Sequence, residues 1–112
     1  MAIYDNLPVY KTSYDLLLLI FTFLKNMTKE YKYTIGEKLK NETMELITNI
    51  YRANSVLKKE NYIEKARENI EVIRLYIRLT KDLKQLSVVK FIEINENIEF
   101  ISKQLSHWQN SL

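Results

Sequence analysis

The chain has 112 residues, 46% hydrophobic and 28% charged, a composition typical of one soluble globular domain and not of a disordered segment. It contains no cysteine, which excludes disulfides and thiolate metal sites and predicts an intracellular, cytoplasmic protein. The formal net charge of +3 is a mild basic bias, which gains weight if several copies gather in one assembly.

Turn-forming residues are scarce, since Gly36 and Pro8 are the only glycine and proline. This scarcity predicts long helices joined by short connections. It also argues against most catalytic scaffolds, because phosphate-cradling loops and nucleophile elbows are built on glycines. The longest apolar run, residues 16–24, is interrupted only by Thr22 and is shorter than the roughly 20 residues that span a bilayer. We therefore expect a helical surface that holds other molecules.

The first predicted helix covers about residues 9–28, with Pro8 near its first turn. Apolar residues occur on almost all of its sides, which is typical of a buried helix. Those that follow one helical stripe are Tyr10, Tyr14, Leu17, Phe21 and Leu24.

The second predicted helix covers about residues 34–57. Thr34 and Glu37 have the T-x-x-E spacing of a capping box, which marks a helix start. The apolar stripe that follows consists of Leu39, Thr43, Leu46, Ile50, Ala53 and Leu57. A weaker second apolar face holds Met44, Ile47 and Tyr51.

The third and fourth predicted helices cover about residues 59–86 and 87–110, with Ser87 as the cap of the fourth. The apolar face of the fourth helix consists of Phe91, Ile94, Ile98, Ile101, Leu105 and Trp108. Helices of about 24 residues are ~36 Å long. Four such helices with short links predict an all-α, antiparallel up-down four-helix bundle that forms a single domain over residues 1–112.

The third helix carries two apolar stripes on opposite sides. The first consists of Ile63, Ala66, Ile70, Ile73 and Ile77, and the second of Val72, Leu75, Leu79, Leu83 and Leu86. One four-helix core covers only one stripe, and monomers rarely expose large apolar patches. The second stripe is therefore predicted to be an oligomer interface. The alternative is that the first helix covers both stripes.

Residues for catalysis or metal binding are few. His107 is the only histidine, so neither a multi-histidine metal site nor a histidine dyad can form within one chain. Carboxylates recur at helical spacing, but the E-x-x-H motif of di-iron bundles is absent. We expect a protein that is not an enzyme and that has no catalytic residues, metal or cofactor.

Basic residues gather on the third helix and around two connections. The predicted contacts to nucleic acid or a protein partner are Arg67, Arg74, Arg78, Lys81 and Lys84. A second basic group surrounds the first connection and consists of Lys25, Lys29, Lys32, Lys38 and Lys40, together with Tyr31 and Tyr33. Basic side chains beside exposed aromatic rings suit phosphate contact and base stacking. The alternative is a solvated face of an amphipathic helix.

Several segments resemble one family of helical proteins. They are residues 8–11 (PVYK), residues 33–39 (YTIGEKL), the R-L-x-K-D-L pattern of residues 78–83, and the L-x-x-W-x-x-S pattern of residues 105–111. Together they resemble the four-helix proteins that include Avd, the accessory variability determinant of diversity-generating retroelements. The wider family includes the intervening-sequence proteins encoded within large-subunit ribosomal RNA genes.

The resemblance implies a homopentameric barrel with a basic surface. It implies partnership with a reverse transcriptase and its template RNA, and possession of no catalytic residues, so that the protein supports cDNA synthesis and mutagenic retrohoming. DNA is a further expected ligand. The alternative is a structural bundle of the intervening-sequence type with no polymerase partner, and a neighbouring reverse transcriptase gene would distinguish the two.

Overall fold

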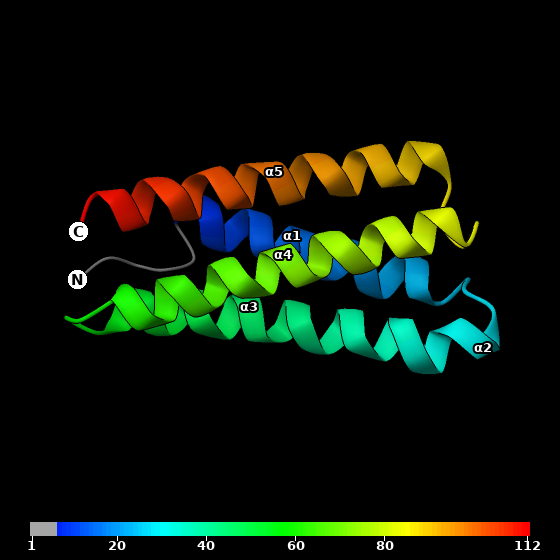
Figure 1. Ribbon diagram of the computed structural model, residues 1–112, viewed down its shortest axis with the longest axis horizontal. Helices are drawn as coiled ribbons and strands as arrows, with labels where there is room; N and C mark the ends of the chain where they lie inside the picture. The colour runs from blue at the N-terminus through cyan, green and yellow to red at the C-terminus, as the bar shows by residue number, and fades with distance from the viewer. Residues whose placement is uncertain (1–6) are drawn as a thin grey trace.

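Four long helices run alternately up and down in the computed structural model, which describes residues 7–112 (Figure 1). They are α1 (Pro8–Leu24), α3 (Glu37–Ser55), α4 (Glu60–Asp82) and α5 (Val88–Asn110). No strand occurs in this part of the chain, and no helix in it combines the length and the hydropathy of a membrane-spanning segment. The predicted all-α, four-helix class is confirmed.

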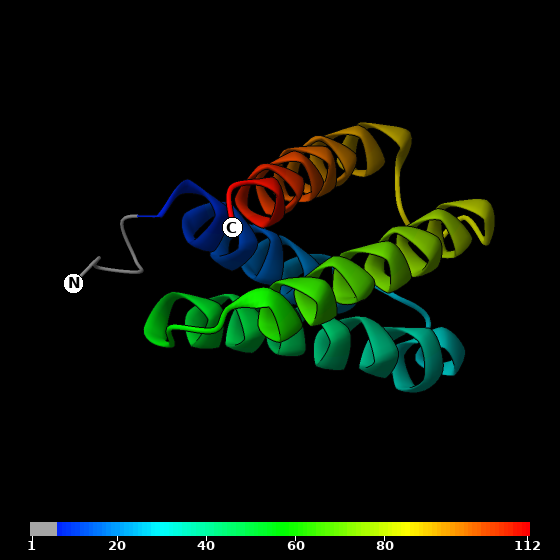
Figure 2. The same cartoon turned by 60° about the vertical axis from the view of Figure 1, so that its left-hand side comes forward.

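The helices stand at the corners of a bundle about one core. Helix α1 packs against α3 and α5, and α4 packs against the same two helices from the opposite corner (Figure 2). The largest fully buried side chains are all leucine or isoleucine: Leu16, Ile20, Leu39, Leu46, Ile50, Ile63, Ile70, Ile73, Ile77, Ile94, Ile98 and Ile101. Every residue of the first α4 stripe is therefore inside the bundle, as its spacing predicts.

Helix α1 is not buried all round, which corrects the expectation from its composition. Its core face consists of Val9, Ser13, Leu16, Ile20, Phe23 and Leu24, whereas Tyr14, Leu18 and Phe21 are exposed. A corner helix has neighbours on two sides only, so part of an all-apolar surface stays outside. The buried Ser13 hydroxyl donates to the Val9 carbonyl at 2.7 Å, which satisfies its polar group within the helix.

The predicted capping box at Thr34 does not form. A short helix, α2 (Lys29–Tyr31), leads through a π-helical segment, η2 (Lys32–Gly36), directly into α3. Thr34 lies inside this continuous helix, and its hydroxyl donates to the Glu30 carbonyl at 3.1 Å. Gly36 is buried where the helix meets α1, and a Cβ there would lie 3.2 Å from Leu24 Cδ2. A larger residue at position 36 would require the Leu24 side chain to shift.

Three helix ends fall earlier than predicted. Helix α1 ends at Leu24 and α3 ends at Ser55, so Leu57, predicted to continue the core stripe, is 99% exposed in the next connection. Helix α4 ends at Asp82 and is followed by Lys84 at φ 61°, in the left-handed region. This conformation reverses the chain without a glycine, at a local cost in strain.

The early end of α4 also corrects the position of Leu86. Because the helix has stopped, Leu86 no longer continues the outward stripe, and it is only 7% exposed within the core. It is therefore not a residue of the predicted oligomer interface. Ser87 follows as the cap of α5, where its hydroxyl oxygen accepts from the Lys90 backbone N–H at 3.1 Å.

A buried polar chain links α3 to α4. The Asn49 side-chain amide donates to Asn69 Oδ1 at 2.8 Å, and the Asn69 amide donates to Glu42 Oε2 at 2.9 Å. Glu42 also lies 3.4 Å from the ammonium of Lys38. Each buried amide has its partner only when the two helices are in this alignment. These hydrogen bonds therefore fix the register of α3 against α4.

We expect Asn69→Ala to lower the free energy of unfolding by about 1–3 kcal/mol, because it leaves the Asn49 amide and the Glu42 carboxylate without their buried partner. Urea denaturation followed by circular dichroism measures the change. The exposed Asn41→Ala on α3 is the matched control and should stay within about 0.5 kcal/mol of the parent. Equal stability of all three proteins would contradict a role for the network.

Candidate partner-binding surfaces

Three of the predicted basic residues lie on the side of α4 that faces α5. The Arg67 guanidinium donates to Oε1 of Gln109, near the end of α5. The Lys81 ammonium lies 4.8 Å from the centroid of the Phe91 ring, a cation–π contact near the start of α5. These contacts join α4 to α5 along one side of the bundle, called the α4–α5 edge below. Neither Arg67 nor Lys81 has an acidic partner among the described residues.

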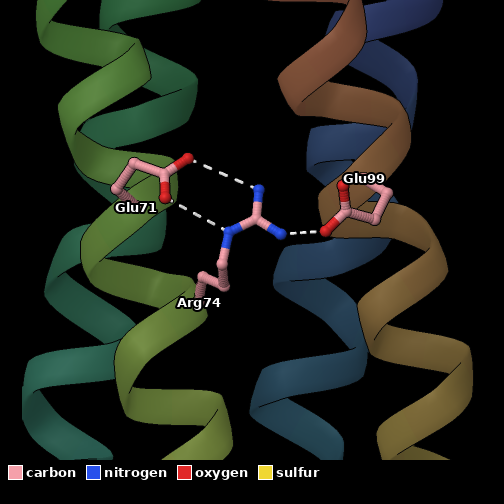
Figure 3. Close-up of polar contacts among 3 residues, drawn as sticks. All are labelled: Glu71, Arg74 and Glu99. Atoms are coloured by element: carbon pink, nitrogen blue, oxygen red, sulfur yellow. Dashed lines mark hydrogen bonds and ion pairs between the residues drawn. The ribbon is translucent and has the colours of Figure 1, made fainter.

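Arg74, the third of these residues, has a different environment, between two carboxylates (Figure 3). Its Nε lies 3.2 Å from Glu71 Oε1 on the same helix, and its Nη1 donates to Glu99 Oε2 on α5. The guanidinium fork is thus occupied by neighbours that offset its charge. Arg74 is better suited to joining α4 to α5 than to the phosphate contact that its place in the row of arginines predicts.

Arg78 and Lys84 point to solvent. The side chain of Arg78 is 78% exposed, and its Nε lies 3.9 Å from Asp82, a long and exposed ion pair of little energetic weight. Lys84 is exposed in the connection after α4 and has no ion pair with a described residue. Of the five predicted residues, Arg67, Arg78 and Lys84 are exposed, whereas Arg74 and Lys81 are half-buried.

The basic edge is local, because α4 as a whole is formally neutral. It has five basic and five acidic side chains. These are Lys65, Arg67, Arg74, Arg78 and Lys81 against Glu60, Glu64, Glu68, Glu71 and Asp82. Positive charge on α4 is therefore available to a partner mainly where a basic side chain lacks an acidic neighbour among the described residues, as at Arg67 and Lys81.

The outer face of α4 is apolar in its second half. Leu75 is 62% exposed and Leu79 is 38% exposed, whereas Val72 and Leu83 on the same stripe are half-buried. Helix α1 lies at the diagonal corner and does not cover these leucines, so the alternative in which it covers both stripes is wrong. Further exposed apolar side chains lie on the neighbouring pair α1 and α3: Tyr14, Leu18, Phe21, Met44 and Tyr51.

No group of three or more His, Asp or Glu side chains comes together as a metal site within residues 7–112. His107 is exposed near the end of α5, and the half-buried Trp108 beside it packs on the core. No buried side-chain nitrogen or oxygen in this range lacks a hydrogen-bond partner. The polar groups of the interior are therefore accounted for by the fold itself, and the candidate sites lie on the surface.

Comparison with protein families finds a match to the bAvd-like family over residues 8–112, nearly the whole chain. The match confirms the resemblance drawn from the sequence motifs. Comparison with curated proteins finds no match.

The contacts of Arg74 predict a measurable coupling between α4 and α5. In a double-mutant cycle of Arg74→Gln and Glu99→Gln, we expect an interaction energy of about 0.2–1 kcal/mol, since the pair is partly exposed. Urea denaturation of the four proteins gives the value, which should fall through ionic screening as salt rises from roughly 0.05 M to roughly 0.5 M. A cycle of Arg78→Gln with Glu99→Gln is the control, with coupling near zero. Identical coupling in both cycles would contradict the assigned pairing.

Proposed function

Because the chain belongs to the bAvd-like family, we propose that it is a non-enzymatic accessory protein of a diversity-generating retroelement. In this role it binds the element's reverse transcriptase and template RNA, and so supports cDNA synthesis and mutagenic retrohoming. The family match over residues 8–112 is the observation that carries the proposal. The exposed basic side chains of the bundle support the proposal. A scaffold that organises a polymerase and a polyanion needs accessible charge and no pocket.

The basic α4–α5 edge supplies the partner contacts in this proposal. Arg67 and Lys81 keep their charge while packing on α5, and Arg78 and Lys84 extend to solvent. Guanidinium forks bind phosphate or carboxylate with two parallel hydrogen bonds, which suits both RNA and an acidic patch on the polymerase. Arg74 acts indirectly, because it holds the edge together through Glu71 and Glu99.

Self-association completes the proposal. Leu75 and Leu79, with the half-buried Val72 and Leu83, form the interface on one copy. The exposed apolar residues of α1 and α3 are the complementary face on the next copy, because α1 lies at the corner diagonal to α4. A contact between two different faces repeats around a ring. The family resemblance implies five copies, and five chains of formal charge +3 together carry +15.

The α4–α5 edge can be tested by charge reversal. We expect Arg67→Glu with Arg78→Glu to abolish capture of the retroelement's reverse transcriptase and to weaken template RNA binding. Each lost phosphate contact should reduce the slope of log affinity against log salt by about 0.7 for single strands. Pull-down and fluorescence anisotropy measure the two effects.

The matched control for charge reversal is Arg52→Glu with Lys103→Glu, which makes the same charge change at exposed sites on α3 and α5. Unchanged capture and RNA affinity in the first double variant would show that the edge is not the partner surface. Equal losses in both double variants would show that only total charge matters.

The interface can be tested by size-exclusion chromatography with light scattering. We expect the parent to run as a multiple of 13.5 kDa, and Leu79→Glu to run as a monomer, because a buried, unpaired carboxylate in the interface is strongly unfavourable. Leu57→Glu is the matched control, since Leu57 is exposed in the connection at the far end from Leu79, and it should keep the parent mass. A monomeric parent would contradict the proposed self-association.

A further inference from the structure

The positive charge of the chain is concentrated in the connections at one end of the bundle. Helices α1, α3 and α4 each have equal numbers of basic and acidic residues. The α1–α3 connection, residues 25–36, and the α4–α5 connection, residues 83–87, together contain Lys25, Lys29, Lys32 and Lys84 against the single acidic residue Glu30. Their surplus of three positive charges compares with two in the connection of residues 56–59 and with a deficit of one on α5.

The two connections form one surface. Both lie at the end of the bundle where α2 is labelled (Figure 1), and the Thr28 backbone N–H donates to Gln85 Oε1 at 2.9 Å across 57 positions of sequence. None of the four lysines forms an ion pair with a described residue. Positive charges that have no acidic partner among the described residues, on two connections joined by a hydrogen bond, are available to an anionic ligand.

The opposite end differs, although it also has two lysines. Its connection, residues 56–59, contains Lys58 and Lys59. The ammonium of Lys59 donates to the carbonyls of Ala53 and Val56, at 2.9 and 2.7 Å, and so closes the end of α3. Of the two lysines there, Lys58 is exposed and Lys59 is half-buried, so the first end, with four lysines, is the basic end of the molecule.

An exposed aromatic ring stands among the lysines of the basic end. Tyr33 is 62% exposed, follows Lys32 directly and lies four positions after Lys29. Residues at this spacing share one face of a helix. A ring with basic neighbours offers a base a stacking surface while the lysines contact phosphates, a combination that suits strands whose bases are not already paired.

We propose that the basic end, formed by Lys25, Lys29, Lys32, Tyr33 and Lys84, binds single-stranded nucleic acid. The inference deepens the proposed function and rests on it for the identity of the natural ligand, which would be an unpaired segment of template RNA. The lysines attract the backbone without regard to sequence, and Tyr33 stacks on one base. Four neutralised phosphates give a salt slope of about −2.8 on single strands.

The test measures binding of the whole chain to a fluorescein-labelled 12-nucleotide oligo(U) RNA by anisotropy, in the absence of any polymerase. We expect Lys25→Glu with Lys29→Glu and Lys32→Glu, which leaves Lys84 and the rest of the α4–α5 edge unchanged, to lower affinity at least 10-fold and to reduce the salt slope by about 2. The matched control is Lys58→Glu with Lys65→Glu and Lys103→Glu, the same charge change at exposed sites elsewhere. Circular dichroism verifies that both variants are folded, and a control that binds as weakly as the first variant would overturn the proposal.

The role of Tyr33 is tested separately. We expect Tyr33→Ala to weaken binding about 5-fold or more and Tyr33→Phe to retain it, because stacking needs the ring and not the hydroxyl. A 12-base-pair RNA duplex should bind more weakly than the single strand and be insensitive to Tyr33→Ala. Equal affinity for both RNAs, or no loss on Tyr33→Ala, would overturn the single-strand assignment.

Two further outcomes distinguish RNA binding at the basic end from membrane binding and from polymerase capture. Lysine-dependent binding to vesicles containing 30% phosphatidylserine, without binding to the RNA, would make a membrane surface the ligand and overturn the inference. Capture of the reverse transcriptase is measured on the same variants. If RNA binding is lost only in the variant Arg67→Glu with Arg78→Glu on the α4–α5 edge, this inference is overturned and the proposed function stays intact. Intact oligo(U) binding without any capture of the polymerase would overturn the proposed function and leave this inference intact.

Discussion

Enclosure of α4 between α3 and α5 is the constraint from which both candidate surfaces follow. The helix has one inward apolar stripe, and all of its residues are buried in the core: Ile63, Ala66, Ile70, Ile73 and Ile77. With that stripe inside, the edge towards α5 must present Arg67, Arg74 and Lys81, and the outer side must present Leu75 and Leu79. A rotation of α4 about its axis would bury charge and expose isoleucine, which is costly on both counts. The core thus determines what the surface offers.

Sequence periodicity predicts the helical blocks and the inward stripes of α3 and α4 because burial selects apolar residues at a fixed angular spacing. It fails for α1, whose apolar residues lie on every side, so only the positions of α3 and α5 decide which of them are covered. It also fails at helix ends. The helix that contains Thr34 begins at Lys29, next to the hydrogen bond of Thr28 to Gln85 across 57 positions of sequence, and α4 ends at Asp82, two residues before Lys84 in the left-handed region. A capping pattern of four residues contains neither feature.

The candidate site divides in the same way between local and long-range effects. The row of arginines on α4 is visible in the sequence. Glu99, an acidic partner of Arg74 in this row, lies 25 positions away on another helix. A local pattern therefore treats Arg74 as equivalent to Arg78, although one is held between carboxylates and the other faces solvent. The Asn49–Asn69 pair is similarly hidden, because a buried asparagine resembles an exposed one until its partner is known. The sequence predicts the composition of a face, whereas pairing across faces depends on how the helices pack.

The separation of roles between the sides and the ends of the bundle has a consequence for an assembly. In the proposed ring, copies meet through their long sides, at the α4 leucines and the apolar residues of α1 and α3. In a ring with its symmetry axis parallel to the helices, every copy points the same way along the axis. All of the basic ends would therefore lie on the same side of the ring. Each copy would then add its surplus lysines to one surface, where several weak contacts along a single strand combine into one strong attachment. The +3 charge is modest on one chain, and it becomes effective through its placement.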